Sequence, residues 1–348
     1  MRKFFSFVLV ILLLIPGVIL SEDSPAFPGG AKDLLETPAP ARIHAEPEPT
    51  AEPPAILNRT QVPDPLEGFR FKLDSKMLHI WFPNIQDCDE AVIMYDDNVW
   101  LIDCASEKAA PRGVEMMARL HIPKIEKLFN THPHYDHIQG LQVTNESVPI
   151  DEVLFGANFP ADTNESMITA RAYAEEACID IGTFSDGETF AMGDGAVTLT
   201  FYYNEYTPEE YANLNERSLI NHQNDCSALT LLQYGDRRML FMADMERNYG
   251  QANFYPRLQA GLDLSADVLK YPHHGNNGML YEFWKAVDPK LVVITNHRGT
   301  NKPGIEFLTY QRVGIFYTNY PERYVHLYTD GHTWVIEYVP LTDFPPLQ

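Results

Sequence analysis

The order of apolar and polar residues divides the chain into three parts. An apolar run over residues 4–16 follows Arg2 and Lys3 and gives way to polar residues near Ser21. This order is typical of a secretory signal peptide over residues 1–21, and an uncleaved N-terminal membrane anchor is the alternative. Residues 22–67 are rich in Pro, Ala and Glu without apolar periodicity, which predicts a disordered linker. Periodic apolar positions begin near residue 68, so one folded domain is expected over 68–348.

The first half of this domain combines strand patterns with one helical pattern. Residues 77–84 and 90–106 predict three short strands with a turn at residues 96–98. Residues 107–122 repeat at helical spacing. The apolar face of this predicted helix consists of Val114, Met117 and Leu120. A further buried strand is expected over 125–130, and it runs directly into a loop rich in histidine.

The second half of the domain also contains strand patterns. Strands are expected at 195–203, in a hairpin within 226–246, within 265–278 and within 288–300. A late hairpin is expected over 323–339. Three of these strands deliver acidic or histidine residues at their ends, namely Asp244, the pair His273 and His274, and His297. In open α/β sheets, functional sites collect beyond the carboxyl ends of the strands, so these residues are candidates for one site.

The loop after residues 125–130 holds the densest cluster of potential metal ligands in the sequence. His132, His134, Asp136 and His137 fall within six consecutive positions. Side chains at alternate positions of an extended loop point the same way, so His132 and His134 can bind one cation. Asp136 and His137 would turn toward a second cation. Imidazole and carboxylate ligands suit zinc, iron and manganese. Two neighbouring ions need a bridging carboxylate, and Asp244 is the natural candidate.

Net charge and cysteine content bear on the expected partners and location of the protein. The formal net charge is −22, and so acidic a protein repels polyanions, which disfavours nucleic acid as a partner without excluding a local basic groove. The four cysteines form no CxxC pair, and both disulfides and buried free thiols remain open. With the signal-peptide pattern, we expect a secreted or cell-surface protein that contacts a membrane only through an uncleaved N-terminus. The oligomeric state cannot be read from the sequence.

At these motifs the sequence resembles the metallo-β-lactamase-fold hydrolases over about residues 75–335. The matching segments are "LIDCAS", "THPHYDH", "MLFMADME" and "VLKYPHHGNNG". The combination of "NDCSALTLLQYGDRRMLFMADME" with "LKYPHHG" is most similar to the branch that includes the hydrolase domain of the DNA-uptake protein ComEC. The resemblance implies an α/β fold, the four-layer αββα metallo-β-lactamase-like sandwich.

The resemblance also implies roles for the site residues. His132 and His134 would bind the first metal, while Asp136, His137 and His274 would bind the second, with Asp244 bridging the two. His273 would then be a second-layer residue or a hydrogen-bond donor to substrate, and the roles of the two adjacent histidines can be exchanged. The implied catalytic residues are Asp136 and His273.

Two positions depart from the family pattern. A third histidine of the first metal site is missing, and the corresponding segment 218–228 matches the ComEC-like Asn/Asp-x-Ser pattern instead. Residues of this region and one further strand end are candidates for substrate or auxiliary contacts: His222, Asn224, Ser227 and His297. Ala243 stands where a glycine usually precedes the bridging aspartate.

Together these features predict an exported metal-dependent hydrolase of phosphodiester or related ester bonds. It would use a water or hydroxide held between two divalent metal ions, with zinc favoured over manganese or iron. A small-molecule, cell-wall or lipid ester is the expected substrate. The alternatives are an iron-dependent redox enzyme of the same fold and a non-catalytic binding domain.

Overall fold

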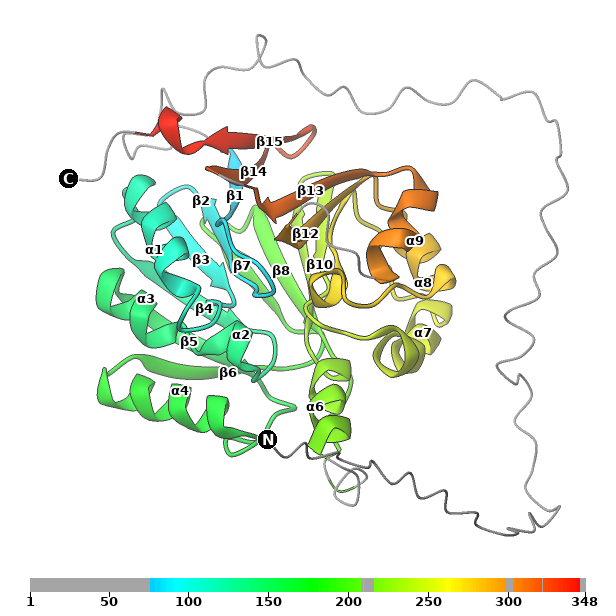
Figure 1. The fold of residues 1–348 in the computed structure, drawn as a ribbon, viewed down its shortest axis with the longest axis horizontal. Coiled ribbons are helices and arrows are strands. Elements are labelled where there is room, and N and C mark those ends of the chain that lie inside the picture. Colours follow the sequence, from blue (N-terminus) through cyan, green and yellow to red (C-terminus); the bar gives the residue numbers. More distant parts are fainter. Residues whose placement is uncertain (1–75, 208, 210–215, 298–302, 321, 345–348) are drawn as a thin grey trace, which may run out of the picture. The chain divides into compact units, whose positions relative to one another are not determined.

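A computed structural model describes residues 76–207, 209, 216–297, 303–320 and 322–344 (Figure 1). The predicted signal peptide, the predicted linker and the first residues of the predicted domain lie outside the described residues. Within the described part of the chain, no helix is both long and apolar enough to cross a membrane.

The first sheet has eight strands in the order β15-β14-β1-β2-β3-β4-β5-β6. Its strands are β1 (Leu78–Phe82), β2 (Ala91–Tyr95), β3 (Asn98–Ile102), β4 (Ile125–Asn130), β5 (Ile150–Gly156), β6 (Asp180–Phe184), β14 (Arg323–Thr329) and β15 (Trp334–Pro340). Pairing is antiparallel from β15 to β3 and parallel from β3 to β6. Both hairpins expected in this sheet are present, the first with its turn at residues 96–97.

The second sheet has seven strands in the order β13-β12-β11-β10-β9-β8-β7. Its strands are β7 (Thr189–Met192), β8 (Val197–Tyr202), β9 (Leu229–Tyr234), β10 (Arg237–Phe241), β11 (Val268–Lys270), β12 (Leu291–His297) and β13 (Gly314–Asn319). The strands from β10 to β13 are parallel, so their carboxyl ends lie on one edge of the sheet.

Helices cover the outer face of each sheet (Figure 1). The first sheet is covered by α1 (Ala110–Arg119), α3 (Leu141–Ser147) and α4 (Glu165–Glu176), and the second by α7 (Ala252–Gln259), α8 (Tyr281–Val287) and α9 (Pro303–Gln311). Four further short helices are α2 (Tyr135–Ile138), η1 (Arg247–Gln251), η2 (Pro272–Gly275) and η3 (Leu341–Asp343), and α6 (Glu216–Asp225) precedes β9.

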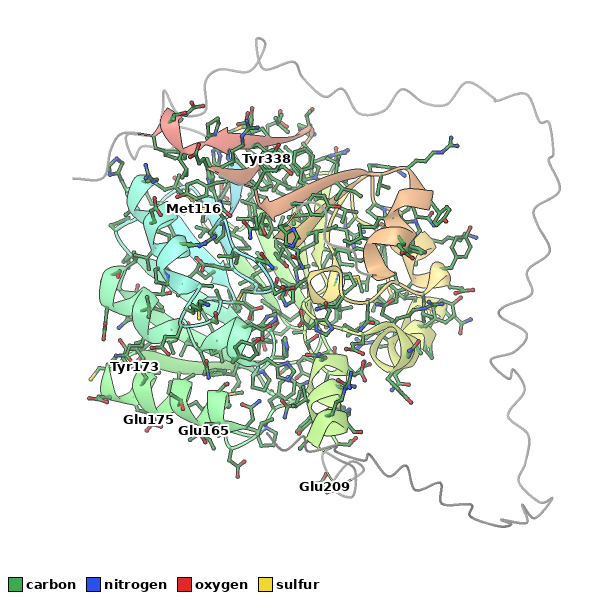
Figure 2. All side chains as sticks on the ribbon, in the orientation of Figure 1. Met116, Glu165, Tyr173, Glu175, Glu209 and Tyr338 are labelled. Carbon is green, nitrogen blue, oxygen red and sulfur yellow. The ribbon has the colours of Figure 1, made fainter. Side chains whose placement is uncertain are left out.

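Side chains fill the space between these layers, as Figure 2 shows. One apolar cluster lies between the two sheets and includes Ile93, Phe201 and Val293. A second lies under the helices of the first sheet, where Met116 of α1 is fully buried (Figure 2), and a third lies under the helices of the second sheet. Three apolar interfaces separate four layers, so the predicted αββα sandwich is confirmed.

The cysteines are thiols in this fold. Cys88, Cys104 and Cys226 are buried and Cys178 is exposed, and none of the four is bonded to another. Three of them therefore act as small buried side chains, which is one of the two interpretations that the sequence left open.

Candidate metal centre

The strand ends bring the predicted ligands to one edge of the sandwich. His132 and His134 follow β4, and Asp136 and His137 lie in the short helix α2 directly after them. Asp244 follows β10 of the other sheet. The pair of adjacent histidines follows β11 in η2. The site therefore lies where the two sheets meet at the carboxyl ends of their central strands.

Four of the predicted residues form a compact group of donors. Asp136, His137, Asp244 and His274 each offer one ligand atom, and these atoms lie within 4.8 Å of one another. The His274 Nε2 atom lies 3.4 Å from Oδ2 of Asp136 and 3.4 Å from Oδ2 of Asp244. The His137 Nε2 atom lies 3.4 Å from the same Asp244 oxygen. Asp244 thus faces both imidazoles, and of the two adjacent histidines it is His274 that joins the group.

The donor atoms of this group fit a divalent cation. Nε2 of His137, Nε2 of His274 and Oδ1 of Asp244 are buried and have no hydrogen-bond partner among the described residues. Buried polar atoms without partners are rare and costly, so several of them facing one point indicate a ligand. Two imidazole nitrogens and two carboxylates are a donor set that zinc, manganese or iron accepts.

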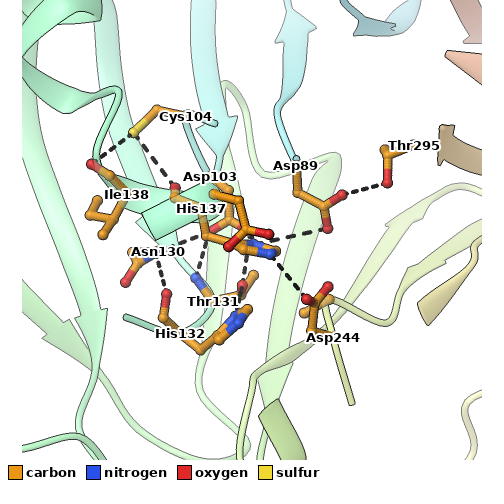
Figure 3. A network of polar contacts seen from close by, with 12 residues as sticks. Asp89, Asp103, Cys104, Asn130, Thr131, His132, His137, Ile138, Asp244 and Thr295 are labelled. Carbon is orange, nitrogen blue, oxygen red and sulfur yellow. Dashed lines mark hydrogen bonds and ion pairs between the residues drawn. The ribbon is translucent and has the colours of Figure 1, made fainter. Parts of the chain in front are cut away.

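Carboxylates behind the imidazoles fix how the rings present their free nitrogens. His137 Nδ1 lies 2.7 Å from Asp103 Oδ2, and His274 Nδ1 lies 3.1 Å from Asp89 Oδ1. Figure 3 shows the carboxylates of Asp103, Asp89 and Asp244 around the His137 ring. His274 Nδ1 also lies 2.9 Å from Thr295 Oγ1, which itself donates to Asp89. With both Nδ1 atoms facing these acceptors, the Nε2 atoms are the ones that can bind a metal.

Backbone bonds hold the outer carboxylate Asp89 in place. It lies in the connection from β1 to β2, and its N–H donates to the carbonyl of Asp136 over 3.1 Å. Its own carbonyl accepts from the N–H of Ala105 over 2.8 Å, and its Oδ1 accepts from Thr295 Oγ1 over 2.7 Å. This connection therefore joins β12 of one sheet to α2 of the other at the metal group.

The outer carboxylates were not among the residues predicted from the sequence. Asp103 directly follows β3, as Asp244 follows β10 within a few residues, so its place at a strand end was a usable signal. Asp89 lies in an irregular connection and had no such signal.

The charges of the group depend on one another. Burial by itself lowers the pKa of His137, but the carboxylates of Asp244 and Asp103 outweigh burial and hold this pKa well above its usual range. The same balance, with Asp244 and Asp89, raises the pKa of His274 well above its usual range. Burial would raise the pKa of Asp244, yet the facing imidazoles hold it well below its usual value. Protons and a metal cation therefore compete for the same nitrogen and oxygen atoms.

The predicted first metal site is less complete. His132 is fully buried and its Nε2 atom has no partner among the described residues, while its Nδ1 atom lies 3.1 Å from Thr131 Oγ1. His134 lies beside it, with ring centroids 4.5 Å apart, and its Nε2 atom contacts Gln223 Oε1 at 3.0 Å. Within the described residues, these two histidines do not belong to a group of three or more His, Cys, Asp or Glu donors.

His273 lies at the rim of the group. Its Nε2 atom is 3.6 Å from Asp244 Oδ2, its Nδ1 atom is 3.1 Å from Glu246 Oε1, and its side chain is 21% exposed. Both His273 and His274 have positive φ angles, 47° and 50°, and both Nε2 atoms lie near Asp244 Oδ2, at 3.6 Å and 3.4 Å. Glu246 was not predicted as a site residue, and only its position two residues after Asp244 pointed to it.

The auxiliary candidates occupy different surroundings. Ser227 is tied to the first-site loop because the next residue, Ala228, donates its N–H to the carbonyl of Thr131 over 3.0 Å. Asn224 Oδ1 and Ser227 Oγ are buried without partners among the described residues.

The two histidine candidates lie elsewhere. His222 is buried in α6, stacks on Tyr206 at 5.0 Å and accepts the Thr207 N–H at Nε2 over 3.1 Å. His297 lies at the exposed end of β12. The substrate contacts of all four candidates remain predictions.

A four-layer sandwich with His and Asp ligands at the strand ends defines a class of metal-binding α/β proteins. The sequence model of the metallo-β-lactamase superfamily matches residues 91–297. The chain therefore belongs to this superfamily, whose members are mostly metal-dependent hydrolases.

Solved structures resemble the fold at low sequence identity. MEM-A1, a subclass B3 metallo-β-lactamase from a soil metagenome library, is 12% identical with a TM-score of 0.38, covering 58% of this chain and 79% of its own. The metallo-β-lactamase fold protein YhfI from Bacillus subtilis is 11% identical with a TM-score of 0.42, covering 69% and 95%. A diphosphatase from the PhnP family is 14% identical with a TM-score of 0.40, covering 69% and 94%. No curated protein matches the chain significantly.

Proposed function

We propose that the protein is an exported metal-dependent hydrolase that cleaves phosphodiester or related ester bonds. The observation that supports it most directly is the convergence of the unpartnered Nε2 atoms of His137 and His274 with the carboxylates of Asp136 and Asp244. Four such residues on three separate strand ends are expected of a catalytic centre and are unnecessary for a domain that only binds a partner.

The residues at this site would have different roles in hydrolysis. A divalent ion held by the group would supply Lewis acidity and a water of lowered pKa. Asp136 is the most exposed of the four donors, at 13% of its side chain, so it is placed to orient a nucleophile that arrives from solvent. His273 is exposed beside Asp244 and can donate a hydrogen bond to the negative charge that develops on the substrate.

Two ions of unequal affinity are proposed, with zinc favoured over manganese or iron. The second site has four donors, and buried carboxylates orient both of its imidazoles. The first site has His132 and His134 with Gln223 in contact. Filling of the second site should therefore precede filling of the first.

The substrate class follows from charge and from the resemblance to the ComEC-like branch. A chain with a net charge of −22 favours a small-molecule, cell-wall or lipid ester over nucleic acid. The signal-peptide pattern of residues 1–21 supports a secreted or cell-surface location, with an uncleaved N-terminus as the only membrane contact.

The test is hydrolysis of bis(p-nitrophenyl) phosphate by the full chain loaded with zinc or manganese. Asp136→Asn should abolish turnover, whereas Asp151→Asn, the same change at an exposed residue of β5, should retain it. Absence of turnover in a folded protein that holds metal would exclude the diester class and direct the search to carboxylic esters. A chain that binds no metal would favour the non-catalytic alternative, and one that binds iron and reduces or consumes oxygen would favour the redox alternative.

A further inference from the structure

A buried lysine lies directly behind the four-donor group. Lys270 is the last residue of β11, where it pairs with Phe241 of β10 and Val293 of β12. Its side chain is 3% exposed, and its Nζ atom contacts two acceptors, Oδ2 of Asp89 and the carbonyl of Ala243. A buried ammonium is unfavourable unless it is paired, so this arrangement is a specific feature of the site.

One contact of Lys270 leads to the histidine ligand. While Oδ2 of Asp89 pairs with the ammonium, Oδ1 of the same carboxylate lies 3.1 Å from Nδ1 of His274. Thr295 Oγ1 donates to that Oδ1 atom over 2.7 Å and itself lies 2.9 Å from Nδ1 of His274. The ammonium therefore fixes the carboxylate that orients the His274 ring.

The other contact leads to the aspartate ligand. The Ala243 carbonyl accepts from Lys270 Nζ over 3.1 Å and from the N–H of His273 over 2.9 Å. Ala243 has a φ of 42°, a left-handed conformation that alanine adopts rarely. Because Asp244 follows directly, two donors on one carbonyl hold the turn that aims Asp244 at the group.

The negative charge around Lys270 is a second reason why this lysine matters to the site. Four carboxylates surround His137 here: Asp136 and Asp244 belong with it to one group of close donors, and Asp89 and Asp103 to a second. Within the described part of the chain, Lys270 is the only Lys or Arg that forms an ion pair with any of them, and the other partners are histidines.

We propose that Lys270 is a positioning residue that couples the two halves of the second metal site, setting Asp244 through Ala243 and His274 through Asp89. The inference rests on the metal centre of the proposed function and is independent of its substrate. Lys270 touches no donor atom itself and acts only through these two neighbours.

The direction in which zinc affinity changes in a Lys270 variant distinguishes a positioning role of Lys270 from simple charge neutralisation. Lys270→Met removes a positive charge from the site, so electrostatics alone would make a divalent cation bind more tightly. If Lys270 positions the ligands, zinc affinity of the second site should instead fall by about tenfold or more, the usual effect of losing an outer-layer partner. The absorption spectrum of the Co²⁺-loaded full chain should change as well, because the ligand geometry changes.

Further variants complete the experiment. The double variant Lys270→Met with Asp89→Asn restores the net charge without the two connections, and it should also bind zinc weakly. Lys127→Met removes a lysine that pairs with Glu152 at a partly exposed position, and zinc affinity should stay unchanged. If Lys270→Met does not fold, Lys270→Arg carries the test, since it keeps the positive charge and changes the contacts with Asp89 and Ala243. Zinc affinity should fall if Lys270 positions the ligands and stay unchanged if it only neutralises charge.

Zinc affinity equal to or tighter than that of the unchanged protein, with the same Co²⁺ spectrum, would overturn the proposal. A lysine that only supports the fold would lower the melting temperatures of metal-free and metal-loaded protein alike and leave that spectrum intact. A chain that binds zinc but hydrolyses no diester contradicts the proposed substrate and leaves this test valid.

Discussion

The Nε2 atom of His134 lies 3.0 Å from the Oε1 atom of Gln223, on helix α6 of the opposite half of the chain. The same oxygen accepts a hydrogen bond from Asn164 Nδ2 over 2.9 Å, so Gln223 presents an acceptor to the imidazole. His134 must therefore carry its proton on Nε2, which leaves the lone pair on Nδ1. Gln223 thus selects the ring nitrogen that His134 can offer to a first metal ion.

Replacing Gln223 by methionine should weaken the first site alone. Gln223→Met keeps the length of the side chain and removes the acceptor that fixes the His134 tautomer. A zinc titration should show two classes of site, with the weaker class losing about tenfold in affinity and the tighter class unchanged. The matched control is Gln233→Met at an exposed position of β9.

If Gln223→Met lowered zinc affinity in both classes of site, the two metal sites would not be independent of each other. Unchanged affinity of the weaker class would show that His134 does not depend on Gln223.

Replacing Asp103 by asparagine should affect both stability and metal binding. Asp103 is fully buried, and its carboxylate accepts from four donors: His137 Nδ1, Thr131 N, Thr131 Oγ1 and Asn130 Nδ2. An asparagine amide must turn an N–H group toward at least one of these donors. The free energy of unfolding should fall by about 1–3 kcal/mol and zinc affinity of the second site by about 10–100-fold.

Urea unfolding of the metal-free protein and zinc competition measure the two effects of Asp103→Asn separately. Asp151→Asn serves as the exposed control and should change neither quantity. Full zinc affinity in Asp103→Asn would mean that the His137 ring is oriented by packing alone.

The sequence predicted the metal-facing layer of the site better than the layer behind it. Asp136, His137, Asp244 and the pair of adjacent histidines follow strand ends, and parallel strands bring such ends together, so local patterns indicated which residues would meet. The choice of His274 from that pair came from the resemblance to the family. Local patterns also gave the two hairpins of the first sheet, whereas the αββα sandwich was implied by the resemblance to the metallo-β-lactamase-fold hydrolases.

The layer behind the ligands depends on contacts that no local pattern encodes. Asp89 reaches Lys270 across 181 positions of the chain and Thr295 across 206. Gln223 reaches His134 across 89 positions from a helix whose sequence has no metal-ligand spacing. His222, one position earlier, was singled out because it is a histidine, yet its ring packs on Tyr206. Residue type indicated ligands, whereas only the folded chain shows what orients them.

Replacing Ala243 by glycine should stabilise the protein. Ala243 has a φ of 42° directly before Asp244, and a Cβ atom in this left-handed region costs about 1–2 kcal/mol. Glycine adopts the conformation freely, although it loses more entropy on folding. The net gain in the free energy of unfolding should be about 0.5–1 kcal/mol by urea unfolding, with unchanged zinc affinity.

The control for Ala243→Gly is Ala228→Gly, a buried alanine without a positive φ angle, which should lose stability. Ala243→Val should also be destabilising, because a β-branched residue tolerates a positive φ poorly. Loss of stability in Ala243→Gly would indicate that the Ala243 methyl group contributes more through packing than its backbone costs.

Replacing Glu90 by glutamine should remove a pH dependence of stability. Glu90 is 1% exposed, neither of its carboxyl oxygens has a hydrogen-bond partner among the described residues, and a Cβ at Gly113 would lie only 1.9 Å from one of them. Burial raises the pKa of Glu90 to about 8 from its usual 4.5. The folded state therefore holds a proton that the unfolded state releases between these two values. Stability from this group is fully present below pH 4.5 and is lost as pH rises toward and through 8.

Urea unfolding of the unchanged protein and of Glu90→Gln at several pH values between 5 and 9 tests this prediction. Glutamine is neutral throughout, so its advantage should grow with pH at up to about 1.4 kcal/mol per unit until pH 8 and then level off. Glu146→Gln, at an exposed position of α3, should follow the unchanged protein at every pH. A constant difference between Glu90→Gln and the unchanged protein across this range would mean that Glu90 ionises in the folded state near its usual pKa. The carboxylate would then have a partner that stabilises its charge, and the helix at Gly113 would have to move to admit it.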